Sequence, residues 1–294
     1  MSYLRTPQGG IVNRTRLGVN SRGLGAELCR YRKDAQLTLE HVAERLGTSA
    51  STICRLETGK REPTLEEVSA ILAIVGVVGP ERDRLLGLAV GRSGGSGMVE
   101  YTKSTVQSQT YLYFESYATV ITNFQLMLIP GLAQTADYAH AVVSAIQVDE
   151  GDDDIETRIG KRMSRQKILT RRTPPQLNLI LCEQALRAPI GGPKVMGRQV
   201  RHLIDLADRD NVSLRVIPRE VVAHPGLMGQ FVVMEFAKDP TVVFVEARTT
   251  GLFRDDPDEV TLYRLTVEKL LEVALDEPGS VELTRSIATD FDGG

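Results

Sequence analysis

Residues 38–57 read Thr-Leu-Glu-His-Val-Ala-Glu-Arg-Leu-Gly-Thr-Ser-Ala-Ser-Thr-Ile-Cys-Arg-Leu-Glu. The stretch predicts two short helices joined by a tight turn at Gly47, because glycine adopts the positive φ of such a turn without a steric penalty. Ala43 is small at the position where the two helices would cross. Apolar side chains that would close a shared core recur at helical spacing: Val42, Ile53 and Leu56.

Helical periodicity extends on both sides of this pair. The apolar blocks are Leu24, Leu28 and Tyr31 before it, and Val68, Ile71, Leu72 and Val75 after it. Thr64 and Glu67 form a capping-box pattern directly after Pro63, so a helix is expected to begin at residue 65. Strand patterns are absent here, and we expect an all-α unit of five short helices over residues 21–90.

A change in composition separates this unit from the rest of the 294-residue chain. Residues 91–98 read Gly-Arg-Ser-Gly-Gly-Ser-Gly-Met, which is typical of a flexible linker. We therefore expect an N-terminal arm at residues 1–20, the helical unit, the linker and a second domain at residues 99–294.

The second domain is expected to be mixed α/β. Apolar residues alternate at Leu177, Leu179 and Leu181, and again at Val212, Leu214 and Val216. Residues 229–236 and 241–246 predict a hairpin, with Asp239-Pro240 in its turn. Helices are expected near residues 132–146, 155–171, 194–208, 257–275 and 280–290.

Composition and charge narrow the class of protein. Hydrophobic residues make up 42% and charged residues 25% of the chain, as in folded soluble proteins. The net charge of −3 hides an asymmetry, because residues 1–92 carry 14 Lys and Arg against 10 Asp and Glu, while the rest is acidic. One end of the chain is therefore suited to phosphates. No apolar run reaches the ~18 residues of a membrane span, and three cysteines without a CxxC pair fit a reducing cytoplasm.

Residues 38–57 resemble the helix-turn-helix of the Xre/phage-repressor family, whose second helix lies in the DNA major groove. Ser49 is expected to cap that helix. The resemblance places the base-reading positions on Ala50, Ser51 and Arg55, with Thr52 beside them. Arg55 is the best candidate for specificity, because its guanidinium can bind guanine O6 and N7 together, whereas Ala50 offers only a methyl group.

The same resemblance implies two further roles. Lys60 and Arg61 follow the second helix and suit phosphate contacts, which add affinity and salt dependence without sequence information. Arg32 and Glu57 match a structural ion pair that the family often has. The chain departs from the family at Leu39, where a glutamine usually opens the motif, and at the small Ala50.

Almost the full chain resembles an actinobacterial Xre-type regulator of the WhiJ and Scr1 antitoxin-like group. The segments that carry this resemblance are Glu115 to Ala118, Phe124-Gln125, Ile129 to Thr135, Tyr138-Ala139, Arg158, Arg162, Arg165-Gln166, Gly229 to Phe231 and Val245-Glu246. It implies a cytoplasmic transcription regulator that often works with a small partner protein encoded beside it.

Several features of the second domain allow either a structural or a functional interpretation. Arg158, Arg162 and Arg165 recur at helical spacing and could hold an anionic ligand or an acidic partner, although a solvated face is favoured. The acidic run at residues 149–154 precedes their helix and complements its dipole. The aromatic cluster is expected to be core, with a ligand pocket or dimer contact as the alternative: Tyr111, Tyr113, Phe114, Tyr117 and Phe124.

Signals for chemistry are weak. His224 with Glu235 and Glu246 has no metal-ligand spacing, and Gly191-Gly192-Pro193 indicates a turn rather than a phosphate loop. Cys54 is interpreted as a small buried residue rather than a redox switch. Because no nucleophile, base and orienting group are assembled, we expect no enzyme activity, no catalytic residues, no metal and no cofactor.

The sequence therefore favours a regulator that binds double-stranded DNA as a homodimer on a pseudo-palindromic site. One short reading helix makes few base contacts, so two half-sites are needed. In this interpretation the second domain dimerises and receives a signal from a small ligand or a small partner protein. The alternative is an antitoxin-like interaction module that binds a small neighbouring-gene protein, with DNA binding serving mainly autoregulation.

Overall fold

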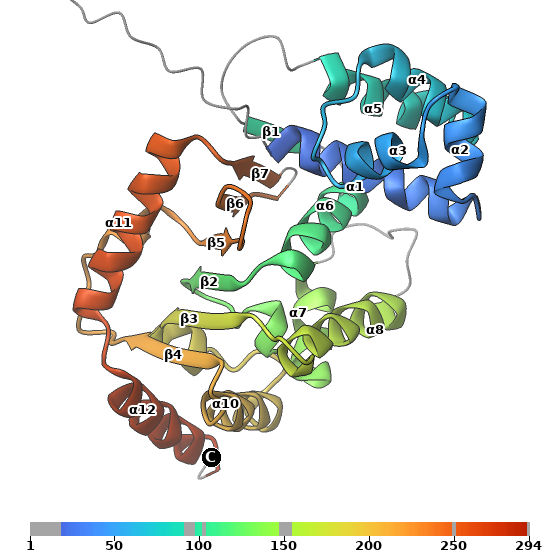
Figure 1. Cartoon of the computed structure of the whole chain (residues 1–294). Helices are drawn as coiled ribbons and strands as arrows, with labels where there is room; N and C mark the ends of the chain where they lie inside the picture. The colour runs from blue at the N-terminus through green and yellow to red at the C-terminus, as the bar shows by residue number, and fades with distance from the viewer. Residues whose placement is uncertain (1–18, 91–97, 102–103, 147–154, 249–250, 293–294) are drawn as a thin grey trace, which may run out of the picture. The chain divides into compact units, whose positions relative to one another are not determined.

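The computed structural model describes residues 19–90, 98–101, 104–146, 155–248 and 251–292 (Figure 1). The N-terminal arm up to residue 18, linker residues 91–97 and the acidic run at 149–154 lie outside these ranges. The chain divides into two compact units, Met1–Arg92 and Ser93–Gly294. No helix in the described ranges is both long enough and apolar enough to cross a membrane.

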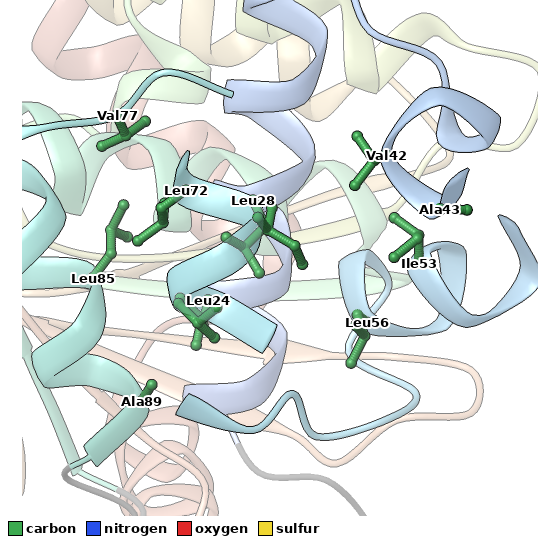
Figure 2. Close-up of a cluster of buried hydrophobic side chains, with 12 residues drawn as sticks. Leu24, Leu28, Val42, Ala43, Ile53, Leu56, Leu72, Val77, Leu85 and Ala89 are labelled. Atoms are coloured by element: carbon green, nitrogen blue, oxygen red, sulfur yellow. The ribbon is translucent and has the colours of Figure 1, made fainter. Parts of the chain in front are cut away.

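The first unit is all-α, as expected. Its described part contains α1 (Val19–Asp34), α2 (Leu39–Leu46), α3 (Ala50–Glu57), α4 (Leu65–Ile74) and α5 (Gly79–Val90). Figure 2 shows Leu28 of α1 between the side chains of α2 and α3 and those of α4 and α5. All five helices contribute to this one buried cluster: Leu24, Leu28, Val42, Ala43, Ile53, Leu56, Val68, Ile71, Leu72, Val77, Leu85 and Ala89.

Helix α4 begins where the capping box predicts. The Thr64 hydroxyl accepts from the backbone N–H of Glu67 at 3.2 Å, and the Glu67 carboxylate accepts from the N–H of Thr64 at 2.8 Å. Two backbone donors that a helix start would leave unpaired are thus satisfied reciprocally.

The second unit is built on a mixed seven-stranded sheet in the order β1-β7-β6-β5-β2-β3-β4. Strands β2, β3 and β4 are parallel, and the remaining neighbours pair antiparallel. The strands are β1 (Met98–Tyr101), β2 (Val120–Gln125), β3 (Gln176–Cys182), β4 (Val212–Ile217), β5 (Phe231–Glu235), β6 (Val242–Glu246) and β7 (Gly251–Arg254). Met98, at the end of the expected linker, is thus the first residue of β1.

Helices cover both faces of this sheet (Figure 1). On one face α11 packs Val260 and Leu270 against Val243 of β6. On the other face α6 packs Phe114 against Phe253 of β7, with ring centroids 5.4 Å apart. The helical elements are α6 (Ser104–Tyr117), η2 (Gly131–Ala133), α7 (Ala136–Ile146), α8 (Ile155–Arg165), η3 (Gln166–Thr170), α9 (Glu183–Arg187), α10 (Pro193–Ala207), η4 (Pro225–Met228), α11 (Pro257–Val273) and α12 (Glu277–Asp290).

The expected strands near Leu177 and Val212 and the hairpin of β5 and β6 are confirmed. Each expected helix is present, although the one near residues 132–146 begins only at Ala136 and the one near 155–171 becomes 3₁₀ after Arg165. Strands β1, β2 and β7 and helices α6 and α9 were not predicted. In β2, Thr122 and Asn123 interrupt the apolar pattern, yet both are buried, and Thr122 accepts from the Asn178 amide of β3 at 3.1 Å.

Candidate nucleic-acid interface

Local signals fix both ends of helix α2. The Thr38 hydroxyl accepts from the backbone N–H of His41 at 3.2 Å and caps the helix start. Gly47 ends the helix with φ 64° and ψ 35°, the left-handed conformation that the turn requires. The predicted turn is therefore confirmed.

Helix α3 begins at the predicted cap. The Ser49 hydroxyl accepts from the backbone N–H of Thr52 at 3.1 Å, and the two hydroxyls lie 2.9 Å apart. Ile53 and Leu56 are buried in the unit's core. The opposite face of α3 is therefore turned to solvent.

The structure brings the expected base-reading residues together on that face. Ser51 and Arg55 are exposed, while Ala50 and Thr52 are half-buried. Within the described part of the chain, the Arg55 guanidinium has no recorded hydrogen bond or ion pair. Its donors are thus available to an external acceptor.

The two expected phosphate-binding residues differ. Lys60 is exposed directly after α3. Arg61 is half-buried and donates to Glu67 of α4 at 2.8 Å. A phosphate at Arg61 would have to share the guanidinium with this carboxylate, a partner that motif matching did not reveal.

Arg32 and Glu57 form the structural pair that the resemblance implies. Arg32 donates to the two carboxylate oxygens of Glu57 at 2.6 and 2.7 Å and to the carbonyl of Leu37 at 2.8 Å. Hydrogen bonding to Glu57 raises the pKa of Arg32. The pair joins α1 to the end of α3 and so fixes the direction of the candidate reading helix.

Helix α3 is also held by a close crossing with α1 at Gly25, which was not predicted from the sequence. A Cβ atom at Gly25 of α1 would lie 2.3 Å from the carbonyl oxygen of Leu56 and 2.9 Å from that of Glu57. Only glycine lets α1 approach the backbone of α3 this closely. In the sequence, this crossing is indicated only by the presence of a glycine inside an amphipathic helix.

Arg162 and Arg165, two of the three arginines of α8, make hydrogen bonds inside the second unit. Arg165 donates to both carboxylate oxygens of the buried Glu115 at 2.8 and 2.6 Å, and Arg162 donates to the Gln134 amide oxygen at 2.8 Å. Burial lowers the pKa of Arg162. The favoured solvated face is therefore wrong for Arg162 and Arg165, and the third arginine, Arg158, is half-buried on the same helix.

The weaker sequence signals resolve individually. The interpretation of Cys54 as buried is wrong, because it lies on the exposed face of α3. His224 lies 3.7 Å from the buried Cys182 sulfur, and no group of three His, Cys, Asp or Glu in the described ranges could hold a metal. Gly191 and Gly192, with φ 77° and 91°, form the expected turn before α10. Of the aromatic cluster, Phe114 and Phe124 are core, Tyr117 is exposed, and Tyr111 and Tyr113 are half-buried.

The capped α3, its exposed polar face and the α2 turn define a DNA-binding regulator of the helix-turn-helix class. Residues 23–85 match a family model described as a helix-turn-helix domain. This class indicates a regulator rather than an enzyme.

The second unit identifies the family. Residues 108–286, more than half of the chain, match a family described as "Domain of unknown function (DUF5753)", and the chain belongs to that family. This chain matches no curated protein and no solved structure.

Proposed function

We propose that this protein is a sequence-specific transcription regulator of the Xre type, of the WhiJ and Scr1 antitoxin-like group. The observation that carries the proposal is the outward face of α3, on which Ser51 and Arg55 are exposed while Ile53 and Leu56 on the opposite face close the core. A helix held in this way can lay its exposed face, from Ser51 to Arg55, in the major groove of DNA.

Arg55 is the residue to which we assign base recognition. It is exposed in the last turn of α3, and its planar guanidinium matches the paired acceptors of guanine. Ser51 and Thr52 add hydroxyl contacts, Ala50 a methyl contact and Ser49 the helix cap.

Phosphate binding is assigned to Lys60 and, in competition with Glu67, to Arg61. Each phosphate contact adds about 0.9 to the slope of log affinity against log salt. The excess of basic residues in the first unit supports this docking, whereas the acidic second unit would be repelled by DNA.

The second unit is proposed to form the homodimer in the cytoplasm and to receive a signal from a small ligand or a small partner protein. Two copies would read half-sites about 34 Å apart along the duplex. Co-purification of a stoichiometric partner that releases DNA would instead favour the antitoxin-like module.

The test is fluorescence anisotropy on DNA from upstream of the protein's own gene, against scrambled DNA, at two salt concentrations. The wild type is expected to keep its preference at the higher salt. Arg55→Ala should remove that preference and leave salt-sensitive binding, at a cost of about 1–3 kcal/mol in discrimination.

Arg45→Ala is the matched control, since it removes one exposed arginine from α2. It should weaken binding to both DNAs alike and keep their ratio. An intact preference in Arg55→Ala would show that α3 is not the reading helix.

A further inference from the structure

Helix α11 carries a stripe of exposed residues on the side away from its sheet. Its inner side packs Val260, Tyr263, Val267 and Leu270 into the core of the second unit. The outer stripe recurs at spacings of four and three residues, as in the seam of two paired helices: Asp258, Leu262, Leu265, Lys269 and Glu272. The two leucines at its centre are 64% and 50% exposed.

An apolar segment lies beside this helix. The single-turn helix η4 packs against α11, and it carries Leu227 and Met228, the latter 94% exposed. Val222 just before it is also exposed. Exposed apolar residues that gather in one place mark an interaction surface.

The charges of the stripe decide what kind of partner fits it. Asp258 lies at the N-terminal end, Lys269 lies toward the C-terminal end, and the leucines lie between them. An antiparallel copy of the same helix, related by a two-fold axis between Leu262 and Leu265, would place each Asp258 opposite a Lys269 and each Leu262 opposite a Leu265. A parallel copy would place like charges together.

We propose that the outer face of α11 is the homodimer interface, with two α11 helices antiparallel about a two-fold axis. Lys269 also contacts Glu272 of its own helix at 2.7 Å, and its ammonium group has donors for a second carboxylate. A stable dimer needs about 800 Å² from each partner, so the segment beside α11 would have to contribute to the contact as well.

This inference deepens the proposed function by naming the surface through which the chain dimerises. The interface itself can be tested without DNA, and only its role in reading two half-sites rests on the proposed function. Sedimentation equilibrium of the full chain is expected to show a monomer–dimer equilibrium. The double variant Leu262→Glu/Leu265→Glu should weaken the dimer at least about 100-fold, because four carboxylates would be buried in an apolar contact.

The matched control is Ile146→Glu, which places a carboxylate on another exposed apolar residue of the same unit. It should leave the dimer unchanged. Circular dichroism should show native helix content in every variant, since the replaced side chains are exposed.

Charge reversal tests the antiparallel register. Asp258→Lys and Lys269→Asp should each weaken the dimer about 10-fold, and the double variant should restore it, because each contact then has opposite charges again. Failure of the double variant to restore the dimer would overturn the antiparallel register.

A wild type that is monomeric at the highest concentration reached would overturn the proposal, and so would a dimer unaffected by the leucine variants. A monomer that still prefers its own upstream DNA would refute the dimer and leave the proposed DNA recognition by α3 intact. A dimer that is weakened by the leucine variants but shows no DNA preference would support the α11 interface and refute the proposed DNA recognition.

Discussion

Removal of Arg32 should destabilise the first unit through the buried pair with Glu57. Arg32→Ala deletes two hydrogen bonds to the carboxylate and one to the carbonyl of Leu37. It leaves the Glu57 carboxylate, in a residue only 5% exposed, without its cation. Removing one partner of a buried ion pair lowers the free energy of unfolding by about 3–5 kcal/mol. Since the free energy of unfolding of a small domain is about 5 kcal/mol, the Arg32→Ala variant should be largely unfolded.

The double variant Arg32→Met/Glu57→Leu separates charge from packing. It removes both charges and keeps most of the side-chain volume, so its stability should lie within about 1 kcal/mol of wild type. The assay is urea unfolding of the fragment 1–92, followed by far-ultraviolet circular dichroism. Arg45→Ala is the surface control, with an expected change below about 0.5 kcal/mol. A loss below about 1 kcal/mol in Arg32→Ala, or a double variant as unstable as the single one, would refute this reasoning.

Three further predictions concern the same unit. Gly25→Ala should cost about 3 kcal/mol in unfolding free energy, because its Cβ would overlap a backbone oxygen of α3, whereas Gly87→Ala, with no atom within 4 Å, should be neutral or stabilising. The hydrogen bond from Arg84 lowers the pKa of Glu81 to about 2, so Glu81 stabilises the fold above its ordinary pKa of 4.5 and this stability is lost as pH falls toward 2. Urea midpoints measured against pH should therefore fall more steeply between pH 4.5 and 2 in wild type than in Glu81→Gln. Cys54 should react with an alkylating agent faster than the other two cysteines and be protected by bound DNA, as mass spectrometry would show; equal labelling with and without DNA would contradict its place on the interface.

The parts of the fold that local rules determine were predictable. The start of α4 depends on two residues three positions apart, and the Gly47 turn depends on one residue's freedom at positive φ. Strands β3 and β4 alternate because their apolar residues enter the core. Strand β2 was missed because its polar Thr122 is paired with Asn178, and no local pattern contains that partner.

In the candidate site, too, local sequence patterns predicted the features set by neighbouring residues and not those set by distant residues. The cap at Ser49 and the exposed Arg55 follow from the order of residues within one short helix. The requirement for glycine at residue 25 arises from the backbone of α3, which is distant in sequence. The pairing of Arg61 with Glu67 likewise depends on how α4 packs. Sequence reasoning therefore located the candidate surface and, through the family resemblance, the Arg32–Glu57 pair that supports it. It missed the close crossing at Gly25 and the pairing of Arg61 with Glu67.

Strand order has a consequence for biosynthesis. Among the described residues, the first strand of the second unit, β1, lies at the sheet edge, and it pairs with β7, the last strand in chain order. Between Tyr101 and Gly251 the ribosome must add the rest of the sheet, which takes roughly 8 to 30 s at about 5–20 residues per second. Meanwhile the five helices before β1 are already complete. A nascent chain would thus carry a finished helical unit tethered to an unpaired strand, and truncation before β7 would leave that strand without its partner.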